Sequence, residues 1–149
     1  MTEEERQTHL KLAKQAYNTT WDWMEKTERT SEEDDTMIHT SHASRYHWGQ
    51  VGNAENLCIG EWQISRVYAL LKRAEPARYH AQRALALCES HALTGFALAY
   101  AWEALARAES VGGELEKAHA AIAKSEEIGQ TLDEEETRIR LKDDLATIL

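Results

Sequence analysis

A histidine-rich segment contains the residue types that bind metal ions or anions. His39 and His42 are three residues apart, and Arg45 follows after three more. Residues at this spacing share one face of a helix, and neutral imidazoles on one face are able to share a metal ion. His80 lies 41 residues after His39 and is a third candidate ligand.

Positive charge around these histidines argues against a metal site. Arg45 lies in the same segment, and Arg78 and Arg83 flank His80. Because these charges repel a cation, we expect no bound metal. A solvent-exposed histidine face is favoured, with packing or an anion site as alternatives.

A second group of residues combines tryptophan with arginine. Trp62 and Arg66 are four residues apart, which also places them on one helical face. Aromatic side chains offer contact area for recognition, and arginine offers a two-pronged donor for carboxylate or phosphate. The same residue types return 41 residues away, because Trp21 matches Trp62 and Arg107 matches Arg66.

Sequence signatures of catalysis are absent. The chain has no His-Glu-x-x-His or Gly-rich phosphate loop, and it lacks the Glu-x-x-His of di-iron bundles. Scattered serines and histidines make no catalytic triad without geometry. These absences favour a protein that is not an enzyme, without excluding one, and we expect no cofactor.

The 41-residue spacing extends to residues that suit helix packing. Matching pairs share their residue type: Ala43 with Ala84, Ala77 with Ala118, and Leu57 with Leu98. Each span holds two helical patterns, so the repeat predicts stacked helix hairpins. Repeats of this kind indicate a solenoid, in which no unit buries its apolar face alone.

Capping residues and glycines predict seven helices and no strand. Two capping boxes, Thr2 with Glu5 and Ser31 with Asp34, open the first two helices. Asn53 caps the third, Pro76 starts the fourth, and Thr94 caps the fifth. The expected spans end near the following residues: Glu25, Gly49–Gly52, Leu71, Ser90, Gly112, Ile128 and Ile148.

Composition restricts the class of protein. The 149 residues predict a single domain over 1–149, and few Gly and Pro favour helix throughout. A net charge of −9 argues against nucleic-acid binding. The region from His39 to Arg83 nevertheless carries six Lys/Arg and three Asp/Glu, so the acidic surplus lies towards the ends.

Cysteine use and hydropathy indicate a cytoplasmic protein. Cys58 and Cys88 lie in apolar helical patterns without metal-ligand spacing, so we expect two buried, reduced thiols. The acidic N-terminus has no signal-peptide pattern. No apolar run approaches the roughly 20 residues that span a bilayer, so we expect no membrane partner.

The predicted hairpins resemble the tetratricopeptide repeat (TPR). In this family a bulky residue and a Leu-small pair lie in the first helix, Gly ends it, and small residues in the second allow close packing. The best match is a single unit: Trp102, Leu105-Ala106, Gly113, Leu115, Ala118 and Ile122. The preceding unit departs from the pattern at Glu61 and at Lys72, where Gly is usual. The run from His42 to Tyr68 is also similar to that of short, uncharacterised bacterial TPR-like proteins.

This resemblance implies a TPR-like α-solenoid of about three antiparallel hairpins and a C-terminal capping helix. It also implies that the first helix of each hairpin lines a concave ligand-binding face. The residues expected to point outward there and bind ligand are Trp21, Trp62, Arg66, Tyr100, Glu103 and Arg107. Alternatively, Trp62 belongs to the core and Arg66 pairs with Glu25 or Glu103.

The resemblance therefore favours a non-catalytic scaffold that recognises a protein or peptide segment. Two alternatives remain open. One is a small-molecule or metal sensor, or an enzyme, that uses the region of His39, His42, Arg45 and Glu61. The other is a homodimer joined through its Trp-rich first helices.

Overall fold

The computed structural model describes residues 1–149 and confirms an all-α protein without strands. The seven helices have the following bounds: α1 Glu3–Glu25, α2 Ser31–Val51, α3 Ala54–Leu70, α4 Ala74–Ser90, α5 Phe96–Val111, α6 Leu115–Gly129 and α7 Glu135–Ala146. None of these helices combines the length and apolar character needed to cross a membrane.

Capping residues set the first three helix starts. In α1 the hydroxyl of Thr2 accepts from the backbone of Glu5, and the Glu5 side chain accepts from the backbone of Thr2, as predicted. The box of α2 lies one residue earlier than predicted, with Thr30 and Glu33 as its members. Asn53 caps α3 as predicted, because its side chain accepts from a backbone N–H in the first turn.

The starts of α4 and α5 correct the sequence prediction. Pro76 lies in the first turn of α4, but the helix begins earlier, at Ala74. The cap of α5 is Gly95 rather than Thr94. Gly95 has a φ of 63°, a backbone conformation that glycine adopts without strain.

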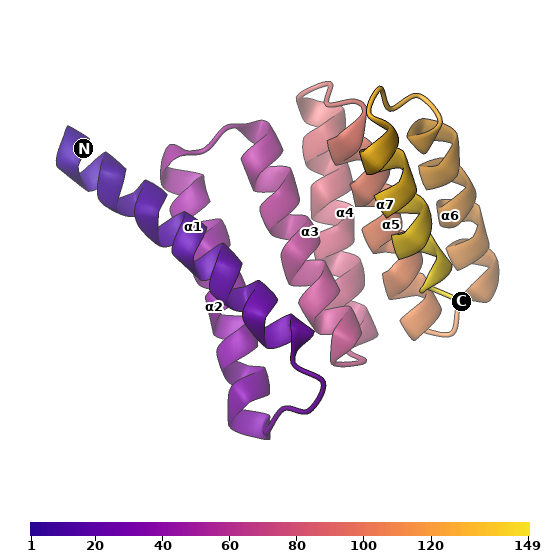
Figure 1. The fold of residues 1–149 in the computed structure, drawn as a ribbon, viewed down its shortest axis with the longest axis horizontal. Coiled ribbons are helices and arrows are strands. Elements are labelled where there is room, and N and C mark those ends of the chain that lie inside the picture. Colours follow the sequence, from indigo (N-terminus) through magenta and orange to yellow (C-terminus); the bar gives the residue numbers. More distant parts are fainter.

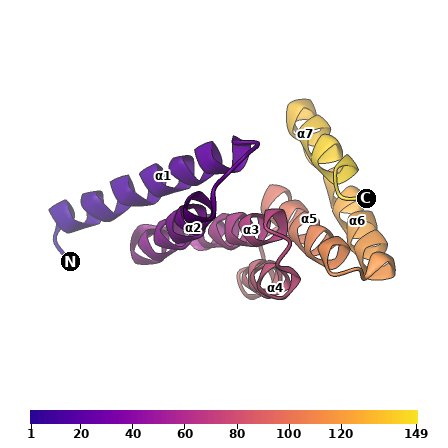
Figure 2. The ribbon, with the colours of Figure 1, turned by 90° about the horizontal axis from the view of Figure 1, so that it is seen from below.

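Successive helices pack side by side along the chain (Figure 1). α1 packs on α2, α3 on α4, and α5 on α6, while α3 also contacts α5. Seen at a right angle, α1 and α7 lie on one side of α3 and α4 lies on the other (Figure 2). This arrangement leaves α3 and α5 as the floor between α1 and α7.

A serine hydroxyl joins the two helices of each of the first three pairs. Ser44 donates to the carbonyl of Ala13 at 2.9 Å, Ser65 to Ala77 at 2.8 Å, and Ser125 to Ala99 at 2.8 Å. The three serines and the three alanines are almost fully buried. Such bonds require close backbones, which explains the small residues at these crossings.

The turn after α3 shows how Lys72 occupies a position where glycine is usual in the TPR pattern. Lys72 has a φ of 62°, and Gly113, 41 residues later, has a φ of 77°. After α3 the N–H of Arg73 donates to the carbonyl of Tyr68 at 2.9 Å. This six-residue closure is the Schellman ending of a helix. Lys72 therefore adopts the left-handed conformation itself, as Gly113 does 41 residues later.

Candidate functional site

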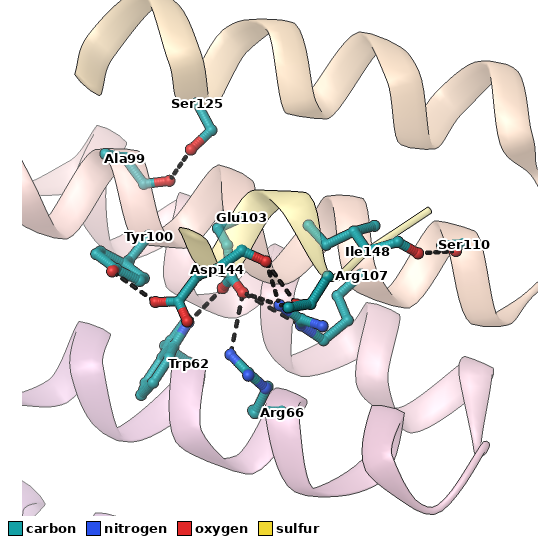
Figure 3. A network of polar contacts seen from close by, with 11 residues as sticks. Trp62, Arg66, Ala99, Tyr100, Glu103, Arg107, Ser110, Ser125, Asp144 and Ile148 are labelled. Atoms are coloured by element: carbon teal, nitrogen blue, oxygen red, sulfur yellow. Dashed lines mark hydrogen bonds and ion pairs between the residues drawn. The ribbon is translucent and has the colours of Figure 1, made fainter. Parts of the chain in front are cut away.

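Glu103 of α5 is fully buried and accepts hydrogen bonds from three side chains (Figure 3). The indole Nε1 of Trp62 donates to Oε2 at 2.7 Å. Arg66 Nη1 and Arg107 Nη2 donate to Oε1 at 3.2 and 2.8 Å. A buried carboxylate is costly in free energy unless it is paired and hydrogen-bonded. These contacts therefore offset the cost of burying Glu103, and they fix the orientation of the Trp62 indole.

Polar contacts also hold α7 over α5. Arg107 Nη2 donates to the backbone carbonyl of Asp144 at 3.1 Å and to the hydroxyl of Thr147 at 3.0 Å. Tyr100 donates its phenolic proton to Asp144 Oδ2 at 2.7 Å. The last helix is therefore positioned by the same residues that surround Glu103.

The structure brings the six predicted ligand-binding residues together but buries some of them. Glu103 has no exposed surface, so the prediction that it points outward is wrong; its carboxylate is used internally. Trp62 and Tyr100, also predicted to point outward, are buried at 8% and 5% exposure, so the alternative in which Trp62 belongs to the core is present. The side chains of Arg66 and Arg107 are 20% and 13% exposed. The alternative in which Arg66 pairs with Glu103 is present, whereas Glu25 has no such role.

An aromatic pocket of about 510 Å³ lies between α1 and α7, above α3 and α5. Eight of its ten lining residues are hydrophobic. Four rings follow one another along its wall: the ring centres of Trp21 and Trp62 are 5.7 Å apart, those of Trp62 and Tyr100 are 5.6 Å apart, and those of Tyr100 and Phe96 are 4.8 Å apart. This volume is within the roughly 300–1,000 Å³ typical of ligand pockets.

The polar atoms of the pocket wall are largely committed to internal bonds. The N–H of Trp62 is bound by Glu103, and the O–H of Tyr100 by Asp144. The two charged lining residues are Arg140 and Asp144, both from α7. Arg140 pairs with Glu136 at 3.5 Å, while Asp144 forms no ion pair. The wall therefore offers ring surfaces and one carboxylate without a cationic partner.

Burial and neighbouring charges shift the pKa of three groups around the pocket. Desolvation raises the pKa of Tyr100 strongly, and the hydrogen bond to Asp144 raises it further. Desolvation also raises the pKa of Tyr17, opposed by a hydrogen bond from Trp21. Desolvation, with repulsion from Arg107, lowers the pKa of Arg66. Both tyrosines are therefore neutral at physiological pH.

Seven of the ten residues that line the pocket were not among the ligand-binding residues predicted from the sequence. Tyr17 precedes Trp21 by one helical turn, Ile59 precedes Trp62 by three residues, and Phe96 precedes Tyr100 by four. The helical period was a usable signal for these three residues. No signal in the sequence placed Asp144 and Arg140 beside them, since this depends on how α7 folds back over α5.

The histidine-rich region forms a separate network between α2, α3 and α4. His80 Nδ1 lies 2.7 Å from Oε2 of Glu61, and Arg45 Nε lies 3.2 Å from Oε1. His42 Nε2 lies 2.9 Å from the hydroxyl of Tyr68. Glu61 is therefore held between an arginine and a histidine inside the protein.

The candidate metal ligands are only partly brought together. His42 and His80 are close, with ring centres 5.3 Å apart, whereas His39 is exposed. Desolvation lowers the pKa of His42, and the nearby His80 adds to this. No group of three or more His, Cys, Asp or Glu side chains is arranged to hold a metal ion.

The two cysteines lie beneath the aromatic pocket. Cys58 lines the pocket, and both cysteines are free and buried, as predicted. Their Sγ atoms are 3.5 Å apart. Cys58 adds an apolar surface to the floor of the pocket.

Comparisons with known proteins identify no relative: no family model, curated protein or solved structure matches the chain.

Proposed function

We propose that this chain is a non-catalytic binding module, a TPR-like α-solenoid whose concave face receives a protein or peptide segment. The observation that carries the proposal is the aromatic pocket between α1 and α7. Its wall is made by α1, α3 and α5, which are the first helices of the three expected hairpins.

Three structural features support a TPR-like arrangement. Each hairpin packs its two helices together, and α3 contacts α5 directly. The left-handed turn at Lys72 returns at Gly113, at the same distance as the sequence repeat. α7 packs on α5 and α6 and exposes charged residues on its other side, as a terminal capping helix does.

The pocket favours an apolar side chain as the part of the segment that enters it. Ring surfaces dominate its wall, and the N–H of Trp62 and the O–H of Tyr100 are already bonded. An entering group that needs several hydrogen bonds would lose its bonds to water without replacement. An apolar or aromatic anchor instead gains free energy from leaving water.

A free small molecule is the second candidate ligand, because the pocket volume suits one. His39, His42 and Arg45, which the sequence offered for such a role, do not line the pocket. Binding experiments distinguish the two candidates. The affinity for a protein or peptide segment depends also on the surface beyond the pocket, whereas the affinity for a small molecule depends on the pocket alone.

Trp21→Ala will weaken peptide binding, because Trp21 forms the α1 wall of the pocket. Peptides selected from a random display library on the immobilised chain would supply the ligand. Loss of a central tryptophan typically costs about 2 kcal/mol or more, so we expect roughly a 30-fold weaker dissociation constant. Calorimetric titration of the selected peptide measures it.

Trp23→Ala is the matched control, since Trp23 is also half-buried on α1 but does not line the pocket. It should change affinity less than threefold, within the roughly 0.5 kcal/mol scatter of neutral substitutions. Equal losses in both variants, or failure of the library to yield any peptide, would contradict the proposed function.

A further inference from the structure

The wall of the aromatic pocket carries a negative charge with which an apolar anchor would not interact. Asp144 is the single carboxylate on its wall, and this residue forms no ion pair. Only its Oδ2 atom is engaged, by the hydroxyl of Tyr100 at 2.7 Å. A half-buried carboxylate beside four aromatic rings favours a cation, because both the negative charge and the ring faces attract one.

The arginine on the same wall does not supply this cation. Arg140 lies one helical turn before Asp144 but pairs with Glu136 at 3.5 Å instead. Its side chain is 60% exposed, so it is free to extend into solvent when another positive group enters. Arg66 and Arg107 are already paired with the buried Glu103.

The balance of charge near Tyr100 points the same way. Asp144 and Glu103 both raise the pKa of Tyr100, and Arg140 lowers it by less. The carboxylate of Asp144, which has no ion-pair partner, therefore places a negative charge beside the Tyr100 ring. A ligand anion would meet this charge and the ring faces unfavourably.

The type of cation follows from the lack of hydrogen-bond acceptors. A primary ammonium group carries three N–H donors that each need a partner. The pocket offers few side-chain acceptors for them, chiefly the carboxylate of Asp144 and the hydroxyl of Tyr17, since Trp62 and Tyr100 present donors that are already used. Methyl groups in place of these hydrogens remove the need for acceptors and pack against the rings.

We infer that the pocket binds a methylated ammonium group, carried as a lysine side chain of the docked segment. This inference rests on the proposed function, because it names the group that the concave face recognises. Asp144 neutralises the charge of this group, and Trp21, Trp62, Tyr100 and Phe96 surround its methyl groups.

Choline and 3,3-dimethyl-1-butanol test the charge requirement, because the two probes differ only in nitrogen against carbon at the centre of the methylated group. Their methyl proton NMR signals report binding when the full chain is added. We expect choline to bind roughly 3- to 30-fold more tightly, the range of a cation–π contact. Equal affinity, or tighter binding of the neutral alcohol, overturns the inference but leaves an apolar binding pocket. Failure of both probes to bind overturns the pocket itself.

Substitutions on α7 separate charge recognition from a folding effect. Asp144→Asn keeps an acceptor for Tyr100 and should reduce the preference for choline, because only the attraction of the ring faces then remains, while leaving the alcohol unchanged. Arg140→Gln should strengthen choline binding, since it removes a competing positive charge. Lys142→Gln makes the same change in net charge on α7 outside this pocket and should have no effect. A loss of both probes in Asp144→Asn, or equal effects of the two glutamine variants, contradicts the assigned role.

The source of the group is tested with N-acetyl-lysine amide and its trimethylated form. The inference predicts that only the trimethylated form binds with an affinity at least equal to that of choline. Binding of choline without the trimethylated lysine would assign the pocket to a free methylated amine and overturn the segment as its source. Binding of the unmethylated lysine at the same affinity would overturn the methyl requirement.

Discussion

Glu103→Gln will lower the free energy of unfolding by about 3 kcal/mol, the low end of the cost of breaking a buried ion pair. The substitution keeps the size of the side chain but removes its charge. Arg66 and Arg107, with only 20% and 13% of their side chains exposed, then lose their shared carboxylate. Partial solvent contact of both arginines keeps the loss near the lower limit. Urea denaturation followed by circular dichroism measures it.

The same experiment also reports on α7. Because Arg107 binds Glu103 and the backbone of Asp144 with the same Nη2 atom, its displacement loosens the last helix. Glu25→Gln is the control, since Glu25 is exposed on α1 and has no ion-pair partner. It should change stability by less than about 0.5 kcal/mol. Equal midpoints for Glu103→Gln and the wild type would mean that the buried network contributes nothing to the fold.

Arg66→Ala will cost less than the loss of Glu103, about 1.5–2 kcal/mol of unfolding free energy, as expected for one hydrogen bond to a charged group. Arg66 makes a single bond to Glu103, at 3.2 Å. The carboxylate keeps its bonds to Arg107 and Trp62, so the substitution leaves no buried charge unpaired. Thermal and urea denaturation of the variant test this value.

Arg66→Lys distinguishes the structural part of this role from ligand recognition. Lysine keeps the positive charge near Glu103 but lacks the planar fork of arginine. We expect Arg66→Lys to recover most of the stability and to bind selected peptides as the wild type does, if Arg66 acts only on the fold. A loss of more than about 3 kcal/mol in Arg66→Ala would mark an indispensable internal bridge and remove Arg66 from the ligand-binding residues.

The helices were predictable because their signals are local. Capping residues, glycines and apolar periods act within a few residues, so Thr2 and Asn53 predicted their helix starts correctly. The two errors in cap position were also local, because adjacent residues compete for the same cap. Thr30 caps α2 where Ser31 was predicted, and Gly95 caps α5 where Thr94 was predicted. Lys72 in a left-handed turn was not predictable, because the tertiary fold overrides its own preference.

For the site, the sequence predicted which residues lie close together but not which of them are buried. The 41-residue spacing correctly placed Trp21 beside Trp62 and Arg66 near Arg107. It did not show that Glu103 is buried, because the repeat position of a residue does not reveal what covers it. The carboxylate is enclosed by Trp62, Arg66 and Arg107. Arg107 also contacts α7, whose placement depends on long-range contacts such as the bond from Tyr100 to Asp144.

Binding of the ligand in the pocket between α1 and α7 can be tested directly through the five tryptophan indole groups. Their N–H signals in a nitrogen–proton NMR spectrum report which part of the chain a selected peptide touches. We expect concentration-dependent shifts of Trp21 and Trp62, with the signals of Trp48 and Trp102, which do not line the pocket, unchanged. Shifts confined to Trp48 or Trp102 would place the ligand elsewhere on the surface and rule out this pocket as the binding site.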